Sequence, residues 1–323
     1  MKTQGARGQP HGQPHGQPHG MGARVACVGI AVIDHIYHVA QLPNTDRKLR
    51  ASAFYESGGG MAAGAATAVA CLGGQASWLG RVGADAKGAA VLLELGKQGV
   101  TTDHARQLEG ASTSHSAVMV DRDGNRAIVA CAGDGLDRDA SWLPLDIITD
   151  HDVVLADIRW EEGALAALSA ARSRGRPAVL DADSTTSPLA ARLIAAASHA
   201  IFSEQAIEDI YATRNIDEGL RLAAQHTPFV AVTLGAQGVA WIDHAQRLQR
   251  LSAPVIKARE TLGAGDLFHG AFALALAEKR DEATALRFAA AAASLKCTRE
   301  GGWDSFPNRQ EVEAWMQQHD TRV

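Results

Sequence analysis

Cysteines, aromatic residues and long apolar runs are all scarce in this chain of 323 residues. The four cysteines are Cys27, Cys71, Cys131 and Cys297, and none of them forms a CxxC pair. This spacing argues against a zinc site and favours reduced thiols in the cytoplasm over a disulfide framework. Aromatic residues make up only 5% of the chain, and the abundance of Ala and Gly suits helices packed closely on a sheet. No apolar run reaches the length of about eighteen residues that a membrane-spanning helix needs, so none is expected.

Several signatures of common protein classes are also missing. The formal net charge is −5 and no long basic run occurs, so nucleic-acid binding is not expected. The phosphate-binding motif G-x-x-x-x-G-K-[ST] is absent, which excludes a Walker-type NTPase. A dinucleotide-binding G-x-G-x-x-G would have to follow the first strand directly. Gly58 and Gly60 begin such a pattern, but its last position is Ala63 and the first strand lies far upstream.

Residues 1–22 differ in composition from the rest of the chain. They repeat Gly-Gln-Pro-His, with histidines four residues apart at His11, His15 and His19. Pro and Gly at this density support neither a helix nor a packed strand, so we expect a disordered tail. A metal-binding tail is the alternative that the histidines leave open. We place the folded domain at residues 23–323.

Strands and helices alternate along the remaining chain, which predicts a mainly parallel sheet covered by helices on both faces. Strands are expected at 25–30, 76–79, 153–156, 178–180, 200–202 and 229–232, and helices at 60–72, 89–98, 161–173, 189–197, 218–225, 264–278, 283–297 and 309–317. Two extended stretches interrupt this rhythm, at approximately 35–57 and 112–132. The second contains the hairpin turn signal Asp123-Gly124. We expect these stretches to form a small separate β-sheet that acts as a lid.

The segment from Glu260 to Phe272 contains the most informative chemistry. Gly263, Ala264 and Gly265 form a small-residue loop that opens a long helix, so several backbone N–H groups and the positive helix end point at one spot. Such a spot favours an anion, for example a phosphoryl group during transfer. Asp266 lies in the first turn beside it, where a carboxylate can accept the proton of an attacking hydroxyl. The structural alternative is a helix-capping aspartate after a tight turn.

These residues resemble a known family. Gly263-Ala264-Gly265-Asp266 with Phe268 and Gly270 is similar to the second signature of the PfkB, ribokinase-like, carbohydrate kinases. The first signature is echoed from Gly58 to Gly88, and the stretch from Val232 to Gly238 resembles the family's nucleotide loop. The resemblance covers residues 24 to about 318 and implies a three-layer α/β/α kinase with a β-sheet lid, using ATP and Mg²⁺. The intact Asp266 and its glycine loop argue against a sugar- or nucleotide-binding regulator that has lost catalysis.

The resemblance also implies roles for individual residues. Asp34 matches the acid that grips substrate hydroxyls, with a solvated turn acid as the structural alternative, and Gly59 and Gly60 match the glycines that approach the sugar. The residues matched to the ATP loop are Thr233, Gly235 and Gly238. Lid strands of this family often pair between subunits, which implies a possible homodimer.

Within the family the chain most resembles the sulfofructose kinase branch. The matching stretches include Val153–Asp157 with Arg159-Trp160, and Leu295–Arg299. This implies the substrate 6-deoxy-6-sulfofructose and its 1-phosphate as product. Lys48 and Arg159 match branch positions that could meet the sulfonate. Ala130 stands where the branch suggests a polar residue, so another ketose, a sugar phosphate or an acidic sugar is the alternative.

Two positions depart from the family pattern. The Asn-x-x-Glu motif that organises magnesium and phosphate reads Ser203-Glu204-Gln205-Ala206, so the protein ligands of Mg²⁺ are not identified. Magnesium is still expected, because the ATP phosphates need their charge neutralised. The acid that opens the second signature is Glu260 rather than Asp, which leaves a monovalent cation site open.

Overall fold

The computed structural model describes residues 22–44, 46 and 48–319, so the predicted tail lies almost wholly outside the described residues. A large sheet organises the chain. Its strands follow the order β14-β13-β12-β11-β10-β9-β1-β4, and all are parallel except the antiparallel β13 and β14 at one edge. The strand bounds are β1 Arg24–Val28, β4 Gln75–Leu79, β9 Val153–Asp157, β10 Ala178–Ala182, β11 His199–Ser203, β12 Phe229–Thr233, β13 Val239–Ile242 and β14 Leu248–Leu251.

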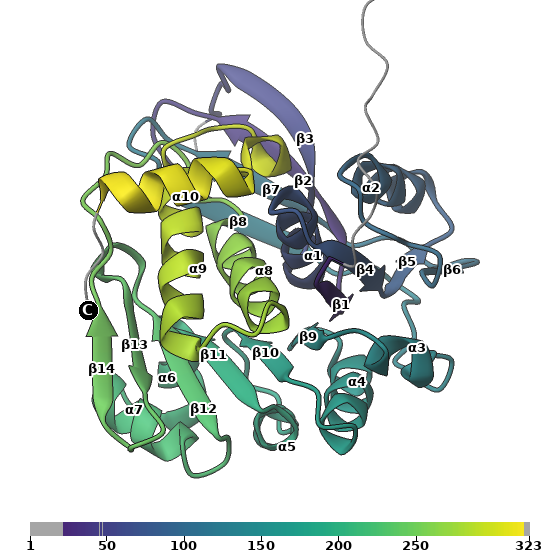
Figure 1. The fold of residues 1–323 in the computed structure, drawn as a ribbon. Coiled ribbons are helices and arrows are strands. Elements are labelled where there is room, and N and C mark those ends of the chain that lie inside the picture. Colours follow the sequence, from purple (N-terminus) through teal and green to yellow (C-terminus); the bar gives the residue numbers. More distant parts are fainter. Residues whose placement is uncertain (1–21, 45, 47, 320–323) are drawn as a thin grey trace, which may run out of the picture.

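Helices cover both faces of this sheet (Figure 1). The central strands β9, β10 and β12 are apolar along nearly their whole length, as strands buried on two faces must be. One face packs against α1 Met61–Cys71, α8 Ala264–Ala277 and α9 Glu282–Cys297, with α10 Arg309–Gln318 lying against α9. The other face carries α3 Leu145–Thr149, α4 Glu161–Ser173, α5 Ala190–Ala196, α6 Glu204–Tyr211 and α7 Ile216–Ala223.

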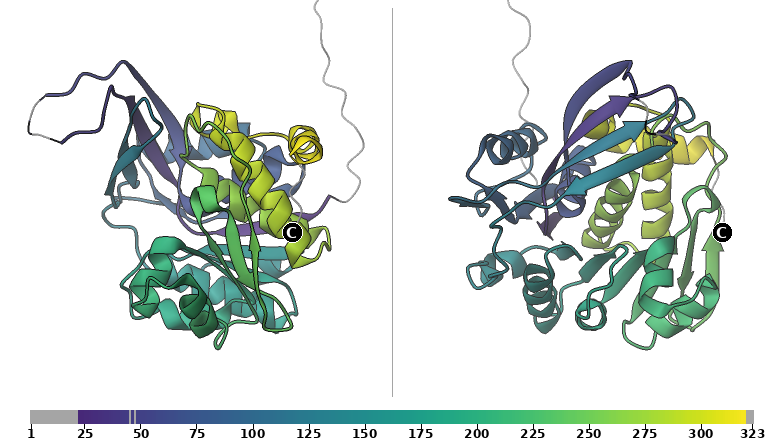
Figure 2. Two further views of the ribbon diagram at one scale, coloured as in Figure 1. Left: turned by 90° about the vertical axis from the view of Figure 1, so that its left-hand side faces the viewer. Right: turned by 180° about the vertical axis from the view of Figure 1, so that it is seen from behind.

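A four-stranded sheet, the lid, lies beside the main sheet (Figure 2). Its order is β3-β2-β7-β8, with bounds β2 Val32–His38, β3 Ala53–Gly59, β7 His115–Val120 and β8 Arg126–Cys131. The register places Asp34 opposite Ser57 on one side and Ser116 on the other. These three residues therefore share one face of the lid, at the end that meets the main sheet.

A smaller unit lies beside the lid. Helix α2 Ala86–Lys97 contacts β2 and β3 of the lid, and the short parallel pair β5 Arg81–Gly83 and β6 Arg106–Leu108 lies beside it. Asp85 caps α2 by accepting a hydrogen bond from the N–H of Gly88. None of the described helices is long and apolar enough to cross a bilayer. All four cysteines are free thiols.

The predicted architecture, a mainly parallel sheet between helices with a β-sheet lid, is confirmed. The expectations were wrong in detail where the local pattern is weak. Strand β2 carries four ionisable side chains among its seven residues, which obscures its alternation, and it begins earlier than the predicted lid stretch at about residue 35. Helix α6 was not predicted, and it begins directly at the end of β11, the strand expected at 200–202, without a loop. Strand β14 alternates poorly and pairs only at the sheet edge.

Candidate active site

A small cavity of about 20 Å³ lies where the lid meets the start of α8. It brings together residues far apart in the chain, from β2, β3, the loop before α8, and the 3-10 turn η2 Gly302–Ser305. Its lining consists of Asp34, Gly58, Gly59, Leu262, Gly263, Asp266, Gly302 and Trp303. The two predicted chemical side chains, Asp34 and Asp266, thus face the same enclosed space.

Asp266 lies in the first turn of α8, as the sequence predicted. Gly263 is the N-cap and adopts the left-handed conformation with φ 72°, which an L-residue with a side chain rarely adopts. Burial, and then the nearby negative charge of Asp34, raise the pKa of Asp266 to about 8, although Arg126 opposes this shift. A carboxylate with this proton affinity is suited to accept a proton near neutral pH.

Asp34 is buried on the lid face that closes the cavity. The Ser116 hydroxyl donates a hydrogen bond to its Oδ1. Burial raises the pKa of Asp34, while the Ser116 hydrogen bond and His35 act in the opposite direction. A side chain on Gly59 would lie 2.2 Å from Asp34 Oδ2, so glycine is required there for the carboxylate to take this position.

Gly60 and the start of α1 complete the wall of the site. Gly60 has φ 96°, and a Cβ there would come within 2.7 Å of the Ile30 carbonyl oxygen. The fully buried Asp157 at the end of β9 accepts hydrogen bonds from the N–H groups of Ile30 and Ala62. This carboxylate ties the chain that leads to Asp34 to the beginning of α1.

A buried ion pair holds the loop before α8 against helix α9. Lys296 Nζ lies 2.7 Å from Glu260 Oε1, and both side chains are fully buried. The Tyr55 hydroxyl and the Gly302 N–H also donate to this carboxylate. Although burial raises it, the pKa of Glu260 is held below its usual range by Lys296 and these hydrogen bonds. Glu260 is therefore satisfied by the protein's own donors, including a fixed cation.

The predicted nucleotide residues surround the short turn η1 Gly235–Gln237 after β12. Thr233 donates its hydroxyl to the Phe202 carbonyl, and Gly235 has φ 53° with open space around it. Gly238 has φ 96°, and a Cβ there would lie 2.0 Å from the Leu251 carbonyl oxygen. Gly238 thus has a clear structural reason to be glycine, while contact of this turn with ATP stays a prediction.

Neither of the two predicted sulfonate-binding cations lines the small cavity. Arg159, just past β9, pairs with Asp183 at 2.5 Å and donates to the Ser184 carbonyl. Lys48 is exposed in the connection between β2 and β3. Within the described part of the chain no hydrogen bond or ion pair joins Lys48 to Arg159. A third cation, Arg126 of β8, donates to the Thr261 hydroxyl beside the anion-binding loop and was not predicted.

The region of the missing Asn-x-x-Glu motif has a different function in this structure. Ser203 caps α6 and donates its hydroxyl to Asp183 Oδ1 at 3.0 Å. Ala206 is buried in the core. Among the described residues no three His, Cys, Asp or Glu side chains converge as a metal site. The protein ligands of a bound Mg²⁺ are therefore not identified, and phosphate oxygens of the nucleotide are ligands of the kind that Mg²⁺ prefers.

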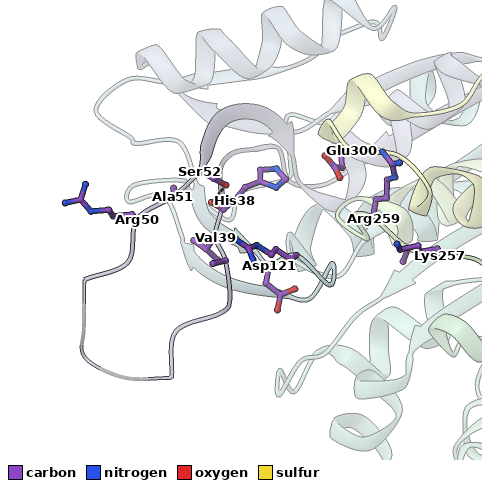
Figure 3. A pocket seen from close by; sticks show the side chains of 12 residues that line it. His38, Val39, Arg50, Ala51, Ser52, Asp121, Lys257, Arg259 and Glu300 are labelled. Atoms are coloured by element: carbon purple, nitrogen blue, oxygen red, sulfur yellow. Dashed lines mark hydrogen bonds between the residues drawn. The ribbon is translucent and has the colours of Figure 1, made fainter.

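A larger groove of about 630 Å³ lies at the other end of the lid (Figure 3). His38 and Ser52 approach it from the lid, and Lys257, Arg259 and Glu300 from the segments flanking the α8 loop and α9. It contains neither Asp34 nor Asp266. Size alone would select this groove, but only the smaller cavity combines two carboxylates with a helix start.

The structure also identifies site residues that the sequence did not reveal. Gly64 of α1 leaves room for Asp266, because a Cβ there would lie 2.6 Å from its Oδ2. Gly58 likewise leaves room for Trp303, because a Cβ on residue 58 would lie 2.1 Å from the Trp303 ring. Ser116 orients Asp34. The run of glycines from Gly58 to Gly64 was a signal for close approach, but not for its partners.

Comparison with known proteins identifies the family and the fold. Residues 23–309 match the pfkB family of carbohydrate kinases. The ribokinase of Bacillus subtilis is 30% identical over 90% of this chain and 98% of its own length. The crystal structure of a putative ribokinase from Agrobacterium tumefaciens superposes with a TM-score of 0.88 at 36% identity, covering 94% of this chain and 100% of that one. The structure of Arabidopsis thaliana ribokinase complexed with ribose and ATP superposes with a TM-score of 0.79 at 26% identity, covering 92% of this chain and 99% of that one.

Proposed function

We propose, from the premise that this chain belongs to the pfkB family of carbohydrate kinases, that it transfers the γ-phosphoryl group of ATP to a sugar hydroxyl at the cavity of Asp34 and Asp266. One observation carries the proposal. A carboxylate with a raised proton affinity, Asp266, lies in the first turn of a helix whose N-cap, Gly263, faces the same cavity. A base and an anion-binding helix start are the two groups that phosphoryl transfer to an alcohol requires.

Each residue then has a defined task. Asp34 accepts hydrogen bonds from sugar hydroxyls and holds the acceptor hydroxyl toward Asp266. Asp266 takes the proton of that hydroxyl while its oxygen attacks the γ-phosphorus, and the bond between this phosphorus and the β–γ bridging oxygen breaks to release ADP. Backbone N–H groups at the start of α8 stabilise the negative charge on the transferred group. Magnesium, bound with the nucleotide, neutralises charge on its phosphates.

The test of catalysis is Asp266→Asn, which removes the base and keeps the volume. We expect turnover to fall about 10²-fold or more, with nucleotide binding and the fold preserved. ADP formation is measured over a panel of ribose, fructose, fructose 6-phosphate, adenosine and 6-deoxy-6-sulfofructose. Near-normal turnover in the variant would show that another group is the base. Binding of sugars without ADP formation by the unaltered protein would favour a regulator.

For the substrate we propose 6-deoxy-6-sulfofructose, phosphorylated at the 1-hydroxyl. The support is the resemblance of the stretch around Arg159 to the sulfofructose kinase branch, together with the Arg159 guanidinium, which is 39% exposed and so open to an anion. A permanent sulfonate needs such a donor, since fructose presents only a neutral hydroxyl there. Ribose is the second candidate, because the named relatives are ribokinases and because Asp183 already neutralises Arg159.

Arg159→Ala separates these substrates. The variant should lose kcat/KM for sulfofructose selectively, by about 10- to 10²-fold, roughly 1–3 kcal/mol for a partly exposed charge pair. Ribose and fructose should be affected much less. The measurement compares kcat/KM for the charged and the neutral sugars in both proteins. Equal losses for all sugars would refute the sulfonate assignment and leave the kinase proposal standing.

We further propose a homodimer through the outer face of the lid. On this face Tyr37 and Phe54 pack ring to ring at 5.0 Å, and Phe54 and Val129 are 53% and 63% exposed. Exposed apolar side chains gathered on one face of a sheet mark an interaction surface. A second copy of the chain that presents the same face would bury these apolar side chains in an interface with twofold symmetry.

A further inference from the structure

A buried pair of titratable side chains lies behind Asp266 and has no task in the proposed reaction. Asp181 ends β10, and His269 lies in α8, one turn beyond the loop that opens this helix. Each side chain is only 6% exposed, and His269 Nε2 lies 3.3 Å from Asp181 Oδ1. Two such groups are costly to bury unless their protons and charges are matched.

The hydrogen-bond geometry fixes one proton of the imidazole. His269 Nδ1 lies 2.8 Å from the carbonyl oxygen of Gly265. A carbonyl oxygen can only accept, so Nδ1 must carry the hydrogen. The other ring nitrogen, Nε2, is fully buried and makes no assigned hydrogen bond. It faces the carboxyl of Asp181, with the Ile201 carbonyl of β11 nearby.

The surrounding charges decide where the second proton resides. The negative charges of Asp266, Asp183 and Asp157, where these groups are ionised, act on Asp181, and the positive charge of Arg159 acts in the opposite direction. Burial followed by these negative charges raises the pKa of Asp181 well above its usual value, while burial lowers that of His269. Both directions favour a protonated Asp181 beside a neutral imidazole over an ion pair. In that state the carboxylic acid donates to the free lone pair of Nε2.

We propose that Asp181 and His269 form a positioning pair for Asp266, in which the protonated Asp181 carboxyl donates a hydrogen bond to Nε2 and the imidazole holds the Gly265 carbonyl through Nδ1. Gly265 directly precedes Asp266, so this chain of two hydrogen bonds fixes the first turn of α8 and the direction of the catalytic carboxylate. The proposal rests on the proposed kinase function. It assigns no contact with substrate to either residue.

Four variants separate the contributions of these two hydrogen bonds, because the variants differ in which of the two they preserve. Asn at position 269 can place its amide near the position of Nδ1 and keep the Gly265 contact, whereas Gln reaches the position of Nε2 and keeps only the Asp181 contact. Asp181→Asn retains a donor toward Nε2, and Asp181→Leu removes it. We expect kcat to fall about tenfold or more in His269→Gln and Asp181→Leu, because small displacements of a catalytic group are costly, with KM for ATP and sugar unchanged. Asp181→Asn should stay within about twofold of the unaltered protein, and His269→Asn should retain more turnover than His269→Gln.

The proposal is overturned if Asp181→Asn loses as much turnover as Asp181→Leu, since an ionised carboxylate would then be needed. It is also overturned if His269→Gln matches the unaltered protein, or if every loss appears in KM. Should Asp181→Leu fail to fold, Asp181→Asn and the two His269 variants still decide. Nitrogen NMR of the His269 ring gives a readout independent of activity: a neutral ring protonated at Nδ1 supports the pair, and an imidazolium refutes it. If the protein phosphorylates no sugar, the proposed function fails while this spectrum still tests the pair.

Discussion

At the scale of single residues, two carboxyl groups have pKa values above those of aspartate in water. Asp34 and Asp266 share one small cavity, and burial raises the pKa of both. Each is accommodated by a glycine whose added Cβ would collide with it, Gly59 for Asp34 and Gly64 for Asp266. The site therefore depends on the absence of side chains as much as on their presence.

The first prediction at this scale concerns pH. A general base works only when ionised, and the pKa of Asp266 is raised to about 8. We expect kcat/KM for the sugar to rise as pH increases through about 8 and to level off above it. The measurement is a pH profile of kcat/KM from about pH 6 to about pH 9.5. A profile that is flat across this range would contradict the assignment of Asp266.

The same shift affects stability with the opposite sign. The folded state binds the Asp266 proton more tightly than the unfolded chain, so the ionisation of Asp266 lowers stability as pH rises toward 8. Asp266→Asn cannot ionise, and its melting temperature should therefore exceed that of the unaltered protein at the alkaline end of the range. At pH values near the ordinary aspartate pKa the two proteins should differ least.

At the scale of elements, α1 and α8 must approach closely for the site to form. These helices pack directly on one another, and Gly270 of α8 would collide with the Ala65 carbonyl of α1 if it carried a Cβ. Below them the Lys296–Glu260 pair connects α9, the α8 loop and lid strand β3 through Tyr55. Removing one partner of this pair would leave a buried charge uncompensated.

The prediction at this scale is that Gly64→Ala impairs turnover without unfolding the protein. The new methyl group would lie 2.6 Å from Asp266 Oδ2 and push the carboxylate aside, so we expect kcat to fall about 10²-fold. Helix propensity favours the alanine by about 1 kcal/mol, which offsets part of the strain in α1.

Gly96→Ala is the matched control. Gly96 lies in helix α2, and a Cβ there meets no atom within 4 Å. This variant should keep normal turnover and melt at a slightly higher temperature. If both variants behaved alike, the space beside Asp266 would have no catalytic importance.

At the scale of the whole molecule, the lid must move for a sugar to enter. The cavity of about 20 Å³ has room for about one water molecule, whereas ligand pockets are usually ten or more times larger. The lid contacts the core through Tyr55, Trp303 and the Arg126–Thr261 hydrogen bond. These contacts are therefore the ones that must break and reform during substrate entry.

The prediction at this scale concerns assembly. We expect the protein to be a dimer in solution and Phe54→Glu to convert it to a monomer, because the charge would have to be buried in the proposed lid interface. Light scattering coupled to size-exclusion chromatography measures the mass of each species. Leu93→Glu is the control, since Leu93 is 62% exposed on helix α2, outside the lid sheet, and should leave the dimer intact. A wild-type monomer would refute the interface.

The sequence by itself determined the features that depend on neighbouring residues. The alternation of apolar strands and helices predicted the layered fold, and Gly263-Ala264-Gly265-Asp266 predicted an acid at an anion-binding helix start, because a helix terminus is a local property of the backbone. It did not reveal α6, which follows β11 without a loop, or the first residues of β2.

Only the tertiary structure decided which distant groups meet. Ser116 bonds to Asp34 across 82 positions of sequence, and Lys296 to Glu260 across 36. The Asp181–His269 pair and the gap that Gly64 leaves for Asp266 arise where a strand and two helices pack together. Burial and the field of neighbouring carboxylates set the proton affinities at such contacts, and both depend on the packing of the whole chain rather than on any one segment.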